Sequence, residues 1–312
     1  MMQHFTTLEG VNLENTWLTI GSFDGIHTGH QQLIRELNRS AHQVSAKSVV
    51  LTFYPHPAVI LQGRLGAFYL TTPNEKIELL DKLKTDIVIT YPFTLELSQS
   101  TAKDYISKLK NHLGFRQLWV GHDFALGKGR EGNVPYLKSL GEELGYQVHV
   151  VEPVMAYGRV ISSSLIRNLI SEGKIAEANR LLGRLYRLSG EVIHGDGRGK
   201  RIGIPTANIE TGEEKLIPGA GIYACRAKIL SKEWAAAVNV GIRPTFPSAD
   251  RASHVEAYIL DFSGDLYTQI LSLEFIERLR GEEKFDSVGE LINQIHMDID
   301  QTRSIVMMLE DE

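Results

Sequence analysis

The residues best suited to chemistry lie together in one turn, GSFDGIHTGH at residues 21–30. This turn follows a short apolar strand pattern and opens an amphipathic helical pattern. Free backbone N–H groups and the positive end of a helix meet at such a turn, so it is suited to bind phosphate. His27 and His30 add donors that can hold nucleotide phosphates while negative charge builds up in a displacement reaction. The pattern favours nucleotidyl transfer.

The turn differs from two common nucleotide motifs. Its glycines do not have the G-x-G-x-x-G spacing of the dinucleotide fingerprint, and it lacks the P-loop pattern, which disfavours hydride transfer and P-loop chemistry. The alternative interpretation is that His27 and His30 cap the helix or are hydrogen-bonded near the core. Their position on either side of Gly29, directly after a strand, favours the binding role.

Two further segments of the first half can contact phosphate. The sequence GHDFALGKGR at 121–130 combines glycines with Lys128 and Arg130, which suits a second phosphate-bearing ligand. The alternative is a solvated surface turn, with Asn133 capping the next helix. The sequence ISSSLIR at 161–167 places three serines before an apolar helical run. Serines there are typical N-caps, and Arg167 can also neutralise a leaving pyrophosphate, so we expect capping and binding together.

The second half contains a different set of polar residues. A cationic, glycine-rich segment, HGDGRGKRIG at 194–203, fails the P-loop pattern but offers mobile backbone donors up to Gly203. Thr206 and Asn208 follow, and two residues apart in a strand they share a face, where both can ligate one magnesium ion. The alternative is a turn-to-strand junction whose hydroxyl is bonded to its own backbone.

Glu256 and Arg243 are less decisive from the residues alone. Glu256 lies in the apolar run VEAYIL and is either a solvent-facing residue of an alternating strand or a positioned base. Alternation predicts that it faces outward. Arg243 lies in NVGIRPTF at 239–246, a segment that either flanks a planar ligand or turns the chain.

The elements that must position these residues fall into two patterns. In the first part short apolar strands alternate with helices, which indicates a parallel sheet whose ligands bind beyond the carboxyl ends of the strands. Strands are predicted at 17–20, 48–53, 86–90, 118–120 and 147–151, and helices near 32–41, 75–83, 102–113 and 134–144.

From residue 185 the pattern changes to strands without intervening helices. Strands are predicted at 186–194, 221–230, 235–240, 255–260 and 269–275, followed by one closing helix at 287–308. We therefore expect a small antiparallel β-barrel with a C-terminal helix. The predicted domains are residues 1–184 and 185–312.

Composition places limits on the function class. The chain has 312 residues, 43% of them hydrophobic and 23% charged, as in globular proteins, and a formal net charge of −5. That charge gives no bulk attraction to nucleic acid or to anionic membranes, so we expect neither as a partner. Cys225 is the one cysteine, which excludes an intramolecular disulfide, and its alternating strand suggests a buried thiol. With no secretory leader or membrane-length apolar run, we expect a cytoplasmic protein.

Taken together, the motifs resemble those of the prokaryotic bifunctional FAD synthetases, the riboflavin kinase/FMN adenylyltransferases. The resemblance covers nearly the whole chain and is carried by the order and spacing of GSFDGIHTGH, TFYPHP, GHDF, ISSSLIR, GIPTANI and VEAYILDF. It implies an N-terminal adenylyltransferase domain of the nucleotidyltransferase Rossmann-like class and a C-terminal riboflavin kinase barrel. The implied substrates are riboflavin, FMN and ATP, with Mg²⁺ as cofactor and FMN and FAD as products rather than prosthetic groups.

The resemblance also implies roles for individual residues. In the first domain, His27 and His30 would bind the ATP phosphates and stabilise adenylyl transfer. Ser164 and Arg167 would contact the triphosphate, and Asp123 would contact the flavin. The adenosine pocket would be shaped by Gly21, Phe23, Asp24 and Gly25. In the barrel, Gly203, Thr206 and Asn208 would bind magnesium and ATP, Arg243 would contact the flavin, and Glu256 would take the proton from the ribityl 5′-hydroxyl.

The chain departs from the family pattern at a few positions. Ser164 replaces a frequent threonine and keeps the hydroxyl, and Leu185 replaces a usual proline. Ala125 and Leu126 replace an arginine–phenylalanine pair, and Asn133 replaces an aspartate. These departures fall on the implied flavin side of the first site rather than on its ATP side. Three alternatives stay open: a riboflavin kinase with an impaired adenylyltransferase domain, a flavin-binding regulator without turnover, and another nucleotidyltransferase.

Overall fold

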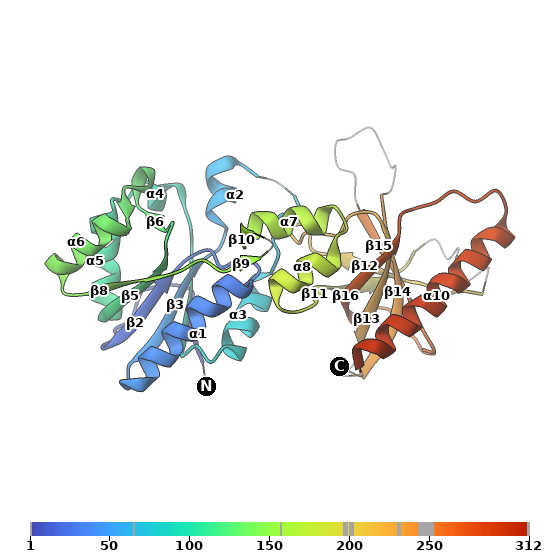
Figure 1. Cartoon of the computed structure of the whole chain (residues 1–312), viewed down its shortest axis with the longest axis horizontal. Helices are drawn as coiled ribbons and strands as arrows, with labels where there is room; N and C mark the ends of the chain where they lie inside the picture. The colour runs from blue at the N-terminus through green and yellow to red at the C-terminus, as the bar shows by residue number, and fades with distance from the viewer. Residues whose placement is uncertain are drawn as a thin grey trace. The chain divides into compact units, whose positions relative to one another are not determined.

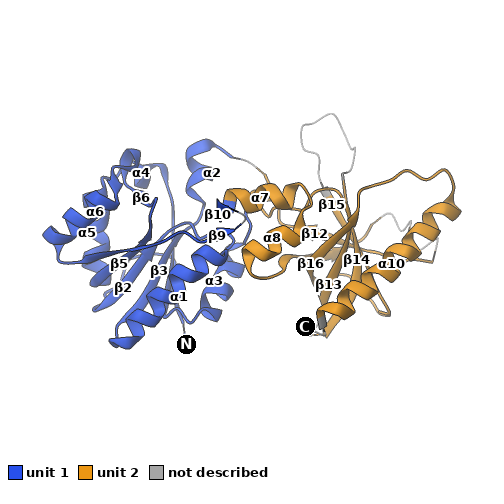
Figure 2. Ribbon diagram, viewed as in Figure 1, with its two compact units in different colours: residues 1–65, 69–163 blue, residues 66–68, 164–312 orange. Residues whose placement is uncertain are grey.

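The structure is a computed structural model that describes residues 2–64, 66–156, 158–195, 199, 203–229, 232–242 and 253–310. Figure 1 shows the order of its helices and strands. Contacts divide the chain into two compact units, coloured separately in Figure 2. Unit 1 comprises residues 1–65 and 69–163, and unit 2 comprises residues 66–68 and 164–312.

Unit 1 is built on a six-stranded sheet in which every neighbouring pair is parallel, in the order β1-β4-β3-β2-β5-β8. The prediction of a parallel α/β domain is confirmed, with elements extended by a few residues at their ends. The strands are β1 (Gln3–Phe5), β2 (Thr16–Ile20), β3 (Lys47–Phe53), β4 (Ile87–Tyr91), β5 (Phe115–Gly121) and β8 (Gln147–Val151). The helices are α1 (Thr28–Gln43), α2 (Pro57–Gln62), α3 (Pro73–Lys82), α4 (Leu95–Ser98), α5 (Ala102–Leu113) and α6 (Val134–Leu144).

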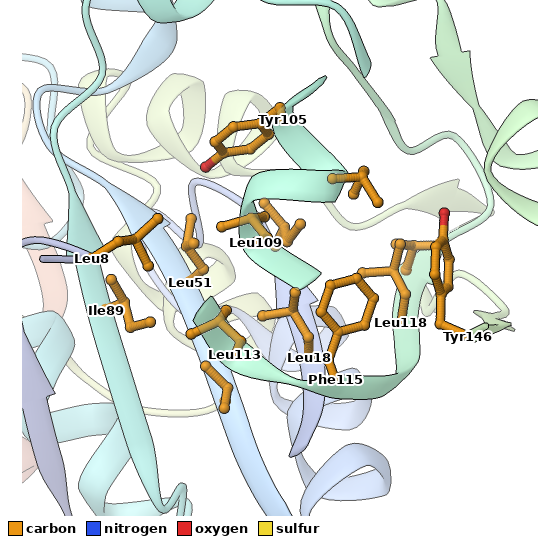
Figure 3. Close-up of a cluster of buried hydrophobic side chains, with 14 of the residues drawn as sticks. Leu8, Leu18, Leu51, Ile89, Tyr105, Leu109, Leu113, Phe115, Leu118 and Tyr146 are labelled. Atoms are coloured by element: carbon orange, nitrogen blue, oxygen red, sulfur yellow. The ribbon is translucent and has the colours of Figure 1, made fainter. Parts of the chain in front are cut away.

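The sheet of unit 1 buries both of its faces. Along β2, Leu18 and Ile20 join a core shared with α5 and α6, whereas Trp17 joins a second core shared with α1. Figure 3 shows the first of these cores, in which side chains of α5 such as Leu109 pack over the strands. Burial on both faces explains why the strands are continuous apolar runs rather than alternating ones.

The strand order creates a switch point beside the histidine turn. From β2 the chain builds β3 and β4 on one side, then returns to add β5 and β8 on the other. Ligands of such sheets bind outside the carboxyl ends of the strands where this reversal occurs. The turns after β2 and β5 flank that position, because the two strands are parallel neighbours. The fold thus puts residues 21–30 and 121–130 at the same end of the sheet, beyond the carboxyl ends of two neighbouring strands.

Short elements that the sequence did not predict complete unit 1. Residues 125–133 fold as β6 (Ala125–Leu126), a 3₁₀ turn η1 (Lys128–Arg130) and β7 (Gly132–Asn133), with β6 and β7 paired antiparallel. A second small hairpin pairs β9 (Met155–Ala156) with β10 (Arg159–Val160). Two or three residues carry too little periodicity to be predicted as strands.

In the described residues of unit 2, two short helices precede a closed antiparallel barrel, and a long C-terminal helix follows it. The barrel order is β11-β12-β15-β14-β13-β16, with β16 returning to β11, so the predicted barrel is confirmed. The strands are β11 (Tyr186–Ile193), β12 (Ala207–Thr211), β13 (Gly221–Ile229), β14 (Lys232–Ile242), β15 (Ser253–Ile259) and β16 (Ile270–Arg280). The helices are α7 (Ser163–Ser171), α8 (Ile175–Leu182) and α10 (Val288–Glu310).

Polar contacts join the helices of unit 2 to the barrel. Asn179 of α8 donates to the Phe275 carbonyl at 2.8 Å and accepts from the Tyr186 N–H at 2.7 Å, so it links the helix to two strands. At the other helix, Arg280 of β16 forms a bidentate ion pair with the buried Asp298 of α10, at 3.0 and 2.8 Å. The predicted closing helix is therefore an integral part of this unit.

The one cysteine lies in the core of the barrel. Cys225 is fully buried in β13, as predicted, and burial raises the pKa of its thiol well above the usual value. Within the residues that the structure describes, no helix combines the length and apolarity that crossing a membrane requires.

Candidate active sites

The turn between β2 and α1 has an unusual backbone. Phe23, Gly25 and Ile26 all have positive φ, at 44°, 81° and 37°. A β-branched residue rarely adopts this conformation, so Ile26 is held there by its surroundings at a free-energy cost. A Cβ on Gly21 would lie 2.9 Å from the Phe23 ring, which therefore packs directly on the glycine backbone. The motif residues are thus required in part for the shape of the turn itself.

Asp24 anchors the turn from beneath. Its side chain has no exposed surface, and its carboxylate accepts hydrogen bonds from the N–H groups of Leu70 and Thr71, each at 3.1 Å. The Thr71 hydroxyl donates to the same carboxylate at 3.2 Å and accepts from the Gly25 N–H at 3.0 Å. Asp24 therefore fixes the glycine turn to the segment that precedes α3.

The two histidines stack face to face. Their ring centroids lie 3.6 Å apart with an interplanar angle of 20°, and the Phe23 ring meets His30 edge-on. Nδ1 of His27 accepts from the His30 N–H at 3.3 Å and so caps α1, which realises the capping interpretation for His27. Capping leaves Nε2 of His27 as the donor in its neutral form.

His30 is held in its neutral form. Burial lowers the pKa of His30 well below its usual value, and the charges of His27 and Lys76 lower it further. Its Nδ1 atom is buried without a hydrogen-bond partner among the described residues. A neutral imidazole with an unused nitrogen can accept or donate one hydrogen bond to a ligand.

Lys76 is a component of this site that the sequence analysis missed. It lies on α3, is only 4% exposed, and donates from Nζ to the Ser22 carbonyl at 2.7 Å and to the Thr52 hydroxyl at 3.1 Å. The Thr52 hydroxyl also donates to the Ser22 carbonyl, at 2.9 Å. Since lysine in a helix is usually solvated, nothing in the spacing marks Lys76 as buried beneath the turn.

The loop after β5 is a compact hairpin rather than an extended glycine loop. Asp123 is exposed, and its carbonyl accepts from Arg130 at 2.9 Å. A Cβ on Gly127 would lie 2.6 Å from the Ala102 backbone nitrogen, so this part of the hairpin packs tightly. Asn133 caps α6 by accepting from the Tyr136 N–H. The capping half of the alternative interpretation is therefore correct for Asn133.

Ser164 and Arg167 lie at the start of α7 and belong to unit 2. Ser164 is exposed, whereas Arg167 donates from Nε to the Phe68 carbonyl at 2.9 Å and stacks its guanidinium on the Phe68 ring, 3.9 Å from the centroid. The neighbouring Ser163 donates its hydroxyl to the Asp24 carbonyl at 2.9 Å. The contribution of Ser164 and Arg167 to triphosphate binding stays a prediction.

In the barrel, three polar side chains line up across neighbouring strands. Asn208 of β12 is paired in register with Glu256 of β15, which is paired with Asn239 of β14. The adjacent residues Val255 and Ala257 are buried, so Glu256 lies on the opposite face, as alternation predicted. Side chains at paired positions of adjacent strands are direct neighbours. The sheet register thus brings Asn208 and Glu256 together.

His254 adds a fourth polar side chain beside this row. Nε2 of His254 lies 3.3 Å from Oε1 of Glu256, and their side chains are 25% and 30% exposed. The opposite nitrogen of His254, Nδ1, and Oδ1 of Asn239 are buried without hydrogen-bond partners in the described ranges. Only register reveals Asn239, because the pairing of strands cannot be derived from a single sequence. His254 lies two residues before Glu256 in the same strand, so alternation alone puts both side chains on one face and could have found it.

The residues predicted to bind magnesium offer suitable donors. The side chain of Asn208 packs on the backbone of Gly195, where a Cβ would lie 2.1 Å from its Nδ2 atom. Thr206 precedes β12, which begins at Ala207, so the alternation that predicted a shared face does not reach it. A hydroxyl and an amide oxygen are hard ligands of the kind Mg²⁺ takes alongside phosphate oxygens. Gly203 is exposed with φ of +81°, and Arg243 lies outside the described residues.

In comparisons with known proteins, each half of the chain matches a different family model. Residues 10–165 match the family model of FAD synthetase, and residues 182–306 match that of riboflavin kinase. The chain is 36% identical over 298 residues to the bifunctional riboflavin kinase/FMN adenylyltransferase of Listeria monocytogenes, covering 95% of this chain and 94% of that protein. The chain belongs to the bifunctional riboflavin kinase/FMN adenylyltransferase family. A Haemophilus influenzae member of this family is 34% identical over 307 residues, covering 97% and 99%.

A solved structure shares the fold over both halves of the family architecture. It is described as a macrolide-efflux protein from Streptococcus pneumoniae and superposes with a TM-score of 0.88 at 28% sequence identity. The superposition covers 96% of this chain and 98% of that one. That description names a different activity. The family assignment of this chain rests on its sequence matches, which extend over both units.

Proposed function

We propose that this chain phosphorylates riboflavin to FMN in its barrel and then adenylylates FMN to FAD in unit 1, using ATP in both steps. The match of the two halves to FAD synthetase and riboflavin kinase carries this proposal. We place the boundary of the two functional domains at residues 184/185, between α8 and β11. Family membership and composition also support a cytoplasmic location.

In the kinase step Glu256 is the base. It takes the proton of the ribityl 5′-hydroxyl as that oxygen bonds to the γ-phosphorus of ATP and the bond to the β-phosphate breaks, which releases ADP. The register with Asn208 supports this role, since it brings the carboxylate beside a residue suited to bind ATP with its metal ion. Thr206 and Asn208 would hold a magnesium ion, which when bound spreads the charge of the phosphates. His254, 3.3 Å from Glu256, orients the carboxylate.

In the transferase step the turn of unit 1 stabilises charge. An oxygen of the FMN phosphate bonds to the α-phosphorus of a second ATP, and the bond to the β-phosphate breaks to release pyrophosphate. The nucleophile is already anionic, so the site needs alignment and donors rather than a strong base. His27 and His30 supply those donors, while Gly21, Phe23 and Gly25 shape the pocket and Asp24 holds it. Ser164 and Arg167 would contact the triphosphate, and Asp123 and Arg243 the flavins of the two sites.

The decisive experiment follows both reactions in one tube. Purified protein is incubated with riboflavin, ATP and Mg²⁺, and the flavins are separated by chromatography over time; a parallel reaction starts from FMN. We expect FMN to rise and then to give way to FAD, and FAD to form in the parallel reaction. FMN without FAD in both tubes would limit the function to the kinase and point to the hairpin at Ala125 and Leu126. The absence of both products would refute the proposal.

A further inference from the structure

The buried ammonium group of Lys76 is not explained by the two histidines or by the motif in which they lie. A buried lysine is normally paired with a carboxylate, because desolvating an unpaired charge costs several kcal/mol. Here Nζ contacts two neutral oxygens, the Ser22 carbonyl and the Thr52 hydroxyl. None of the ion pairs in the described part of the chain includes Lys76.

The charged and titratable groups around Lys76 belong to the histidine turn. Burial lowers the pKa of Lys76 to about 8, and the negative charge of Asp24 opposes that effect. The carboxylate of Asp24 is itself bound to the Leu70 and Thr71 N–H groups, so it does not neutralise the lysine by direct contact. In turn the charge of Lys76 disfavours a proton on His30, which stacks on His27. β3 contributes the uncharged Thr52 hydroxyl to the same contact.

A purely mechanical role does not require a cation. The Ser22 carbonyl already accepts a hydrogen bond from Thr52 at 2.9 Å, and a neutral side chain could supply a second one without the cost of burying charge. Perturbed charges of this kind gather where a protein binds or transforms a ligand of opposite charge. The ligand expected beside this turn, from its helix N-terminus and its donors, is a polyphosphate.

On these grounds we propose that Lys76 is a positioning residue for adenylyl transfer: it fixes the Ser22 carbonyl beneath the turn, and its buried positive charge favours entry of the ATP triphosphate. The same charge keeps His30 neutral, so that its free nitrogen stays available to the ligand. This inference rests on the proposed adenylyltransferase activity of unit 1. It adds a residue from α3, which is remote in sequence from the motif.

The test separates the charge from the hydrogen bond. Lys76→Met removes both, Lys76→Gln removes the charge and keeps a donor, and Thr52→Val removes only a neutral partner of the same carbonyl. For both Lys76 variants we expect the KM for ATP in FAD formation to rise about tenfold, the effect of one charge at roughly 10 Å in a medium of effective dielectric constant about 20. For Thr52→Val we expect a change of less than about threefold, since one of two neutral-acceptor contacts is lost.

The pH profile supplies a readout that a structural role would not move. In the wild type, kcat/KM for FAD formation should fall as the pH rises through about 8, because the free enzyme then loses the Lys76 charge. This alkaline decrease should persist in Thr52→Val and be absent in both Lys76 variants. An alkaline decrease that persists in Lys76→Gln, or an unchanged KM for ATP in that variant, would overturn the inference.

Controls distinguish a failure of the Lys76 inference from a failure of the adenylyltransferase proposal and from a loss of folding. Wild-type protein that forms no FAD from FMN would refute the adenylyltransferase proposal itself, whatever Lys76 does. Folding of unit 1 is checked by tryptophan fluorescence with each variant made in a Trp234→Phe background, so that the signal comes from Trp17 and Trp119, whose rings stack there 6.0 Å apart. The riboflavin kinase rate of the same preparation reports the integrity of the barrel. A Lys76 variant with native fluorescence and kinase rate but unchanged FAD kinetics would also contradict the inference.

Discussion

The two candidate sites are built on opposite principles. In unit 1 the functional groups lie on a strained turn held by buried polar contacts from Asp24, Thr71 and Lys76. In the barrel they lie on regular strands, where Asn208, Glu256 and Asn239 are aligned by the sheet register alone. The turn combines the buried ammonium group of Lys76 with the buried imidazole of His30, whereas the strand presents the partly buried carboxylate of Glu256.

This difference fits the nucleophiles of the two proposed reactions, the phosphate of FMN in unit 1 and the ribityl hydroxyl of riboflavin in the barrel. A phosphate arrives already ionised, so the turn that receives it has only to align it and to stabilise charge. A ribityl hydroxyl arrives protonated, so its site needs a carboxylate to accept the proton. On the proposed assignment of these residues, the two ATP-dependent steps divide into charge stabilisation in one unit and proton transfer in the other.

The largest effect is expected from replacing Glu256, the proposed proton acceptor in the barrel. Glu256→Gln keeps the size of the side chain and removes its ability to take a proton, so FMN formation from riboflavin should fall by about 10²- to 10⁴-fold. FAD formation from supplied FMN should be unchanged in the same preparation. Both rates are measured by flavin chromatography. A loss of FAD formation as large as the loss of FMN formation would break the division between the two sites.

The reciprocal change is His30→Ala in unit 1. Removal of a preorganised donor to a charged transition state costs about 10²- to 10³-fold in rate, so FAD formation from FMN should fall by that factor. FMN formation should be spared, because the barrel supplies its own groups. Initial rates with each flavin test both statements. Unimpaired FAD synthesis would remove His30 from the assignment.

The fold could be predicted from the sequence where strands are long enough to show a pattern of burial. Periodicity was sufficient for the parallel sheet and the barrel, since burial on both faces or on one face leaves a direct record along each strand. It failed for β1 and for the hairpin at residues 125–133, whose strands have only two or three residues. Thr206 was expected inside a strand that begins one residue later.

Within the sites, contiguous motifs were predictable and long-range partners were not. The histidine turn was found because its residues are adjacent in sequence and follow a strand. Lys76 was missed because its contacts with Ser22 and Thr52 depend on how α3 packs, which no local pattern records. Asn239 was missed for the corresponding reason in the barrel, where strand register makes it a neighbour of Glu256. His254 could have been found, because it lies two residues before Glu256 in the same strand and shares its face by alternation.

A smaller effect is expected from the anchor of the turn. Asp24→Ala leaves the buried Leu70 and Thr71 N–H groups without their acceptor, which should lower the free energy of unfolding of unit 1 by about 3 kcal/mol. Denaturant unfolding followed by tryptophan fluorescence measures this loss. Thr71→Val is the matched milder variant, with an expected loss of about 1 kcal/mol. Equal unfolding curves for the wild type and Asp24→Ala would show that the strained turn needs no such anchor.

The smallest effect concerns the one cysteine, which reports on the barrel alone. Cys225 is fully buried and burial raises the pKa of its thiol, so neither access nor thiolate is available in the native state. A thiol reagent should therefore react only as fast as the barrel opens, and Asp24→Ala should leave that rate unchanged while it loosens unit 1. Labelling followed by mass spectrometry measures the rate. Faster labelling in Asp24→Ala would mean that the two units do not hold their sites independently, and the contrast between turn and strand would then describe one coupled structure.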